Sequence, residues 1–194
     1  MFAAMVTATL RSHASGRGSN HDRNEAAMNP TVYVETSVVS YLTARHSRDV
    51  VVAAYQEVTR EWWRSAPSRF VLYASALVIA EARTGDPEAA RARLNVLSAI
   101  PVLEATEEAV ELTRTLLDAG AAPRNAGDDA AHIAIAAANG VNYLVTWNFR
   151  HIANAATRPK IEDVCRRSGY SPPVICTPNE LMEVDDAEAD RPDH

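Results

Sequence analysis

The stretch TVYVETSVVSYL, residues 31–42, runs from an apolar strand into a helix and places a carboxylate at the junction. Its first four residues are β-branched or aromatic, which is typical of a short buried strand. Thr36 and Ser37 suit a tight strand-to-helix turn and a helix N-cap. Glu35 ends the apolar run, and burial there would disfavour its charged form unless other groups pair with it. An acid at this position therefore predicts that polar side chains from other parts of the chain lie beside it in the fold.

Strands and helices alternate along the rest of the chain. Continuous apolar runs predict further strands at 70–75, 101–106, 142–148 and 172–177. Helical periodicity, caps and terminal glycines predict helices over 37–42, 50–66, 76–84, 86–100, 107–120, 128–140 and 160–169. Pro67 is expected to end the helix that begins at Val50. The alternation predicts an α/β fold, a three-layer α/β/α sandwich around a central, largely parallel sheet of four to five strands, with ligands bound at the carboxyl ends of the strands.

The chain of 194 residues is predicted to hold one folded domain, residues 29–182, between a disordered extension at 1–28 and an acidic disordered tail at 183–194. Met28 is an alternative start. No run approaches the roughly 18 apolar residues of a membrane span, and the N-terminal stretch lacks the residue order of a signal peptide. We therefore expect a cytoplasmic protein without membrane contact. The two cysteines have no metal-binding spacing and are expected to be free, buried thiols.

Much of the net charge of −6 belongs to the tail, which carries six acids and one arginine. The remaining domain is near neutral, and its basic residues are arginines apart from Lys160. The planar guanidinium of arginine can bind two phosphate oxygens at once, which lysine cannot. The acidic composition therefore does not exclude a nucleic-acid partner.

Several acids and one amide are predicted to meet at the carboxyl edge of the sheet. In chain order, these residues are Glu35, Glu81, the pair Asp128 and Asp129, and Asn148. Clustered acids would repel one another in a dry cleft, and a divalent cation removes that repulsion. Mg²⁺ and Mn²⁺ prefer hard oxygen ligands, with water in the remaining positions. The pattern therefore favours metal-assisted phosphoester hydrolysis, in which the cation activates water and stabilises the leaving oxygen.

Each of these residues also has a purely structural interpretation. Asp128 is a natural N-cap, and Asp129 would stabilise the positive end of the same helix. Glu81 would pair with a nearby arginine such as Arg83 at the surface. Asn148 would close a turn. Taken singly, the residues do not decide between these interpretations.

Four segments together resemble a PIN domain, with the similarity pointing to VapC-type toxins of bacterial toxin–antitoxin pairs. They are VYVETSVVSYL, LYASALVIAEA, GDDAAHIAIAAANGVNYLVTWNFRHIAN and PPVICTPNELM, and the resemblance covers roughly residues 30–182. It implies a parallel sheet flanked by helices and a Mg²⁺- or Mn²⁺-dependent endoribonuclease that cuts RNA phosphodiesters. It also implies a cognate antitoxin protein that covers the cleft, and a homodimer, for which the helix with Trp62 and Trp63 offers apolar area.

The resemblance assigns the catalytic and metal-binding positions, in chain order, to Glu35, Glu81, Asp129 and Asn148. Asp128 would be a neighbouring ligand that acts through water. Thr36 and Thr146 would steady the first and fourth positions by hydrogen bonds.

Glu35 departs from the family pattern, which usually has aspartate at this position. Its carboxylate reaches about one bond further, and Mg²⁺ requires nearly ideal octahedral geometry, so we expect a shifted site, a preference for Mn²⁺ or slow turnover. The same departure keeps a second interpretation open, namely a catalytically weak or inactive metal-binding module that binds RNA or a protein partner. A Rossmann-like phosphatase is less favoured, because no second acid stands two residues after Glu35 and no glycine-rich loop follows the first strand.

Three further side chains are candidates for supporting roles. His132, three residues after Asp129 on the same helix face, would bond to a ligand or pack between helices, and the second role is favoured. Arg150 and His151 follow the fourth strand near the predicted site, where Arg150 would grip a phosphate. Loop residues of this kind also serve as solvent-facing polar groups.

Overall fold

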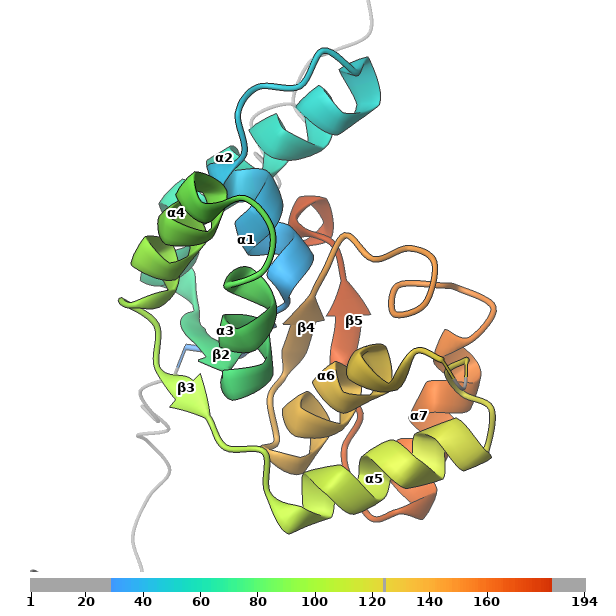
Figure 1. Cartoon of the computed structure of the whole chain (residues 1–194). Coiled ribbons are helices and arrows are strands. Elements are labelled where there is room, and N and C mark those ends of the chain that lie inside the picture. The colour runs from blue at the N-terminus through green and yellow to red at the C-terminus, as the bar shows by residue number, and fades with distance from the viewer. Residues whose placement is uncertain (1–28, 124, 183–194) are drawn as a thin grey trace, which may run out of the picture.

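The computed structural model describes residues 29–123 and 125–182, and it confirms the predicted α/β class. Five strands lie in one parallel sheet in the order β3-β2-β1-β4-β5 (Figure 1). They are β1 (Thr31–Val34), β2 (Val71–Ser75), β3 (Val102–Leu103), β4 (Tyr143–Val145) and β5 (Val174–Cys176). The stretch that opens the domain is the central strand, and Val32, Tyr33 and Val34 are fully buried in it. The predicted extension at 1–28 and the tail at 183–194 lie outside the described residues.

The connections between the strands are helical and cover both faces of the sheet. In chain order the helices are α1 (Thr36–Thr43), α2 (Val50–Arg69), α3 (Ala76–Ala82), α4 (Pro87–Leu97), α5 (Glu107–Asp118), α6 (Gly127–Ala138) and α7 (Arg158–Arg167), with a 3₁₀ turn η1 (Pro178–Leu181) after β5. Helix α6 contacts β4 and α5, whereas α2 contacts β2 and α1.

The strand order reverses at β1, which fixes where the faces and the site lie. The chain runs from β1 to β2 and β3 in one direction, and then crosses back to β4 and β5 on the other side of β1. Right-handed crossovers in opposite directions place the two helix layers on opposite faces, which makes the three-layer sandwich. Ligands of such sheets bind where the order reverses, so the carboxyl ends of β1 and β4 mark the expected site.

Several of the predicted element boundaries are wrong. Pro67 lies inside α2, which continues to Arg69. Because Pro67 is in the last turn and exposed, it removes one backbone donor there, and the helix still closes through the Phe70 N–H on the Ala66 carbonyl at 2.9 Å. Strand β3 is also shorter than predicted, with only Val102–Leu103 paired to β2.

The apolar core encloses one of the two tryptophans of α2 and both cysteines. Trp62 is fully buried in the apolar core, and only the half-buried Trp63 of the predicted dimer pair retains accessible surface. Cys165 and Cys176 are free and buried, as predicted, and burial raises the pKa values of their thiols to about 11 and about 12. None of the helices in the described part of the chain combines the length and hydropathy needed to cross a bilayer.

Candidate metal centre

Glu35 is the buried acid that follows β1, and three donors surround its carboxylate. Oε1 accepts the backbone N–H of Ser37 at 3.1 Å, which makes Glu35 itself the N-cap of α1. Oε2 accepts the Thr146 hydroxyl at 2.7 Å and also the Ser37 hydroxyl. The predicted cap at Thr36 or Ser37 is therefore wrong, because the longer side chain of Glu35 folds back onto the helix start. These donors offset the desolvation of a residue that is only 6% exposed.

Glu81 lies on α3, and its carboxylate points toward the same edge. Its Oε2 accepts the Thr36 hydroxyl and lies 3.1 Å from His132 Nε2. Burial raises the pKa of Glu81, but the hydrogen bonds from His132 and Thr36 and the electrostatic attraction of His132 together outweigh it, so the pKa ends below its usual value. The structure thus pairs Glu81 with these two side chains rather than with Arg83. It also shows that Thr36 steadies the second acid rather than the first.

His132 connects Glu81 to a buried hydrogen-bond chain beneath it. Its Nδ1 lies 2.8 Å from the Tyr33 hydroxyl, which lies 2.7 Å from Ser75 Oγ. Ser75 Oγ in turn accepts the Val78 N–H at 3.3 Å and caps α3. Burial raises the pKa of the Tyr33 phenol well above its usual value, so the phenol keeps its proton.

One assignment of hydrogens satisfies this chain when the imidazole is neutral. Ser75 donates to Tyr33, Tyr33 donates to His132 Nδ1, and His132 Nε2–H donates to the Glu81 carboxylate. The favoured expectation, that His132 packs between helices, is confirmed in its burial, since the side chain is 1% exposed. The imidazole nevertheless reaches an acid of the site, which packing alone did not predict.

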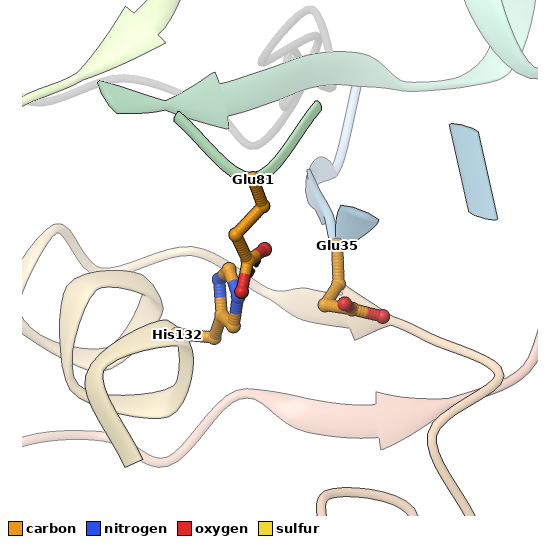
Figure 2. Close-up of side chains that lie close together, drawn as sticks. All are labelled: Glu35, Glu81 and His132. Atoms are coloured by element: carbon orange, nitrogen blue, oxygen red, sulfur yellow. Dashed lines mark hydrogen bonds and ion pairs between the residues drawn. The ribbon is translucent and has the colours of Figure 1, made fainter. Parts of the chain in front are cut away.

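Three of these side chains come close enough to share one ion. One ligand atom from each of Glu35, Glu81 and His132 lies within 4.8 Å of the others. Figure 2 shows Glu81 beside His132, with Glu35 to their right in this view. Two carboxylates and an imidazole suit a divalent cation, because carboxylates accept hard cations and imidazole adds affinity for first-row transition metals. This group could therefore hold a metal ion.

Asp129 and Asn148 meet as predicted, but they form a second cluster with His151. Asp129 Oδ1 accepts the Asn148 amide at 2.7 Å, and Asp129 Oδ2 lies 2.7 Å from His151 Nδ1. Asn148 Oδ1 also accepts the backbone N–H of His151 at 3.2 Å, so the predicted turn-closing role is present as well. Thr146 joins the two clusters, because it donates to Glu35 and accepts the Asn148 N–H at 2.9 Å. Thr146 therefore contacts the fourth position, as expected, and also the first, which was expected to be steadied by Thr36.

Asp128 and Arg150 are exposed beside the clusters rather than within them. Helix α6 begins at Gly127, and its N-cap Ala126 makes no side-chain cap, so the cap predicted for Asp128 is wrong. The chain enters the helix one residue earlier than predicted, which leaves both aspartates in the first turn, where their charge suits the helix dipole. Like Asp129, Asp128 lies outside the three side chains that could share one ion, and its expected role as a ligand through water stays a prediction. The Arg150 side chain is exposed in the loop after β4.

Tyr33, Ser37 and Ser75 belong to the site, although they are not among the site residues predicted from the sequence. The sequence does contain a signal for Tyr33. It stands two residues before Glu35, and because side chains alternate along a strand, the two residues are expected on the same face of the sheet. Ser75 ends β2 as Glu35 follows β1, so it also lies at the carboxyl edge. Ser37 was expected to cap with its own hydroxyl, and instead it donates that hydroxyl to Glu35.

No protein-family model and no curated protein matches the sequence of this chain. The chemistry open to the site comes from its groups: two acids and an imidazole that could hold a cation, and an acid, an amide and a second imidazole beside them. Such a pairing suits a substrate with negative charge, because a cation can neutralise it while the neighbouring donors orient it.

Proposed function

We propose that this protein is a PIN-like endoribonuclease that hydrolyses RNA phosphodiesters with Mg²⁺ or Mn²⁺. The observation that carries the proposal is the approach of Glu35, Glu81 and His132 within 4.8 Å at the carboxyl edge of a parallel sheet. The edge lies where the strand order reverses, which is where such sheets bind ligands. The resemblance of the four sequence segments to VapC-type toxins supports the same chemistry.

The carboxylates of Glu35 and Glu81 would hold the cation. When bound, the cation would polarise the phosphate and supply a water of lowered pKa as the nucleophile. Ser37 and Thr146 keep the Glu35 carboxylate in place, and Thr36 does the same for Glu81. Because each acid is oriented by its own donors, the site needs little rearrangement to receive the ion.

The second cluster would act on the substrate. Asp129 holds Nδ1 of His151, which leaves Nε2 of the imidazole for a phosphate or sugar oxygen. Asn148 fixes the other oxygen of Asp129 and the turn that carries His151. Arg150, exposed in the same loop, offers a guanidinium to a neighbouring phosphate.

The toxin role adds partners to the proposal. An antitoxin chain would cover the carboxyl edge of the sheet, and two copies of this chain would form a dimer. The buried Trp62 contributes nothing to that dimer surface, so of the two tryptophans only Trp63 is left for it. RNA remains the substrate in this proposal, and the arginine-rich basic residues of the domain suit its phosphates.

A second candidate is a metal-binding module that binds RNA or a protein without cutting. One observation favours it: both oxygens of the Glu35 carboxylate are already engaged by Ser37 and Thr146, and Glu35 is a glutamate where the family has aspartate. An acid held this firmly would bind a cation at one fixed distance, which Mg²⁺ tolerates poorly when that distance is not ideal.

Cleavage of a mixed RNA pool with Mg²⁺ and with Mn²⁺ separates the two candidates. Wild type, Asp129→Asn, Glu35→Asp and the exposed control Asp128→Asn would be compared under the same conditions. The nuclease is supported if metal-dependent cleavage is lost in Asp129→Asn and kept in Asp128→Asn. An inert wild type that binds metal, with or without cleavage by Glu35→Asp, supports the second candidate. A wild type that binds no divalent cation overturns both.

A further inference from the structure

An aromatic cavity of about 450 Å³ lies between α2, the segment that follows β4 and the turn η1. Its lining includes Tyr55, Val58, Trp147, Phe149, Arg158 and Asn179. The volume can hold a planar ring system, and the lining has apolar walls with polar groups at the rim.

Three aromatic rings form one wall of this cavity, and they differ in packing and exposure. Tyr55 stacks on Trp147 with ring centroids 4.5 Å apart, and the Trp147 indole N–H donates to Thr59 Oγ1 at 2.8 Å. Phe149 lies 5.8 Å from both rings and is 45% exposed. The first two rings are therefore fixed by packing, while Phe149 presents an aromatic face to solvent that the core does not use.

The backbone of 147–149 links the aromatic wall of the cavity to the two clusters. The backbone N–H of Trp147 donates to Ser37 Oγ at 2.8 Å, and the Ser37 hydroxyl in turn donates to Glu35. Asn148, the next residue, donates to Asp129, and Phe149 follows it. A nucleotide whose phosphate lies at the two clusters would thus have the aromatic wall beside it.

We propose that this cavity binds one unpaired nucleobase of a single-stranded RNA substrate, stacked on Phe149. The proposal rests on the proposed function, because it takes RNA as the substrate and places it next to the phosphate site. Every base has an aromatic face, so stacking on Phe149 and Tyr55 selects for bases without selecting strongly among them. A base in a duplex is paired and stacked on its neighbours and cannot enter a concave site, so the substrate must be single-stranded there.

The rim supplies polar groups for the edge of such a base. Asn179 is exposed at the cavity and offers both a donor and an acceptor. Glu180 also lines the cavity, and Thr177 engages only its Oε2, so the exposed carboxylate adds one negative charge beside Arg158. Arg158 adds positive charge, which suits the polyanionic backbone attached to the base.

Binding of single-stranded RNA tests this proposal separately from cleavage. The probe is a single-stranded oligoribonucleotide carrying 2-aminopurine, measured in Ca²⁺ with the RNA checked by gel to be intact, and compared with its duplex. Phe149→Ala should weaken single-strand binding about tenfold and lose the quenching of 2-aminopurine, whereas Phe149→Trp should keep both. Val110→Ala is a matched control, because Val110 is 44% exposed on α5 and lies away from the cavity lining.

Three outcomes would overturn the nucleobase site. They are an unchanged affinity of Phe149→Ala, an equal loss of duplex and single-strand binding, and a wild type that binds no single-stranded RNA. A Phe149→Ala variant that binds RNA normally but loses a protein partner would assign the cavity to that partner instead. Thermal unfolding of each variant shows whether it is folded. RNA binding without any cleavage would contradict the proposed nuclease while leaving this site intact, so the two failures are distinguishable.

Discussion

The two clusters at the carboxyl edge hold their acids in different ways. Glu35 and Glu81 are oriented mainly by side chains of α1 and α6, with Thr146 directly after β4 also bonded to Glu35, and the His132 imidazole is almost fully buried. Asp129 is oriented by Asn148 and His151, which belong to the half-buried loop after β4. The first cluster is therefore preorganised by the sheet and its helices, whereas the second can adjust with its loop.

This difference suggests a division of work within the proposed site. A cation needs ligands at nearly fixed positions, which the rigid cluster offers. A polymer substrate needs groups that tolerate small changes in its position, which the loop cluster offers. The cost of removing a side chain should therefore depend on which cluster it belongs to.

Glu81→Gln should have the largest effect, because it removes a charged ligand from the rigid cluster. We expect Mn²⁺ affinity to fall by about 100-fold or more, since losing only an outer partner of a ligand already costs about 10- to 100-fold. Titration of Mn²⁺, followed by the loss of its free-ion EPR signal, measures this directly. Glu111→Gln, on the exposed surface of α5, is the control. Asp129→Asn should weaken Mn²⁺ binding less, and an equal loss in both variants would remove the proposed distinction.

Tyr33→Phe should come next, because it removes the hydroxyl that holds His132 without touching an acid. We expect Mn²⁺ affinity to fall about 10- to 100-fold, since His132 loses the bond that orients it toward Glu81. The free energy of unfolding should also fall by about 1–2 kcal/mol, because Ser75 and His132 are left with unmet hydrogen bonds in the core.

A matched tyrosine separates these two effects. Tyr73→Phe makes the same chemical change in the strand partner of Tyr33 on β2, a residue that is not a member of the hydrogen-bond chain. If Tyr33→Phe destabilises the protein but binds Mn²⁺ as the wild type does, the chain supports only the fold. Urea unfolding and the Mn²⁺ titration, done on the same preparations, decide the matter.

The fold was predictable from the sequence because its signals are local. Thr31 to Val34 read as a buried strand, and the residues after them bend into a helix whatever the rest of the chain does. The sheet and its parallel order follow from the alternation of such units. The prediction that Pro67 ends α2 is wrong, because a proline in the last helical turn removes only one backbone hydrogen bond. The helix therefore continues to Arg69.

The partners of the site residues were less predictable, because they depend on contacts across the chain. Thr36 bonds to Glu81, 45 residues away, and His151 bonds to Asp129, 22 residues away. The spacing of acids along the chain indicates which edge they reach, but it does not indicate how they divide into clusters. Asp128 and Asp129 are adjacent in sequence, and only the helix phase decides that Asp129 is the one that turns toward the loop.

His151→Ala tests the loop cluster, and its effect should be confined to turnover. We expect Mn²⁺ affinity to stay within about twofold and RNA cleavage to slow about tenfold, because Asp129 loses one of its two donors and the substrate loses a positioning group. His46→Ala, an exposed histidine in the loop before α2, is the control. A large loss of Mn²⁺ binding in His151→Ala would mean that both clusters hold the ion.

The smallest effect should be a difference in acid stability between wild type and Glu81→Gln in metal-free protein. Burial raises the pKa of Glu81, but its hydrogen bonds from His132 and Thr36 and the electrostatic attraction of His132 together outweigh it, so the folded value lies below the usual 4.5. A carboxyl with a lowered folded pKa contributes stability above its unfolded pKa, and this contribution is lost as the pH falls below about 4.5 and through the folded value. The urea midpoint of wild type should therefore fall more steeply than that of Glu81→Gln between about pH 5 and pH 3. Parallel curves would mean that the two hydrogen bonds do not hold Glu81 before the ion arrives, and the rigid cluster would then owe its order to the cation rather than to the fold.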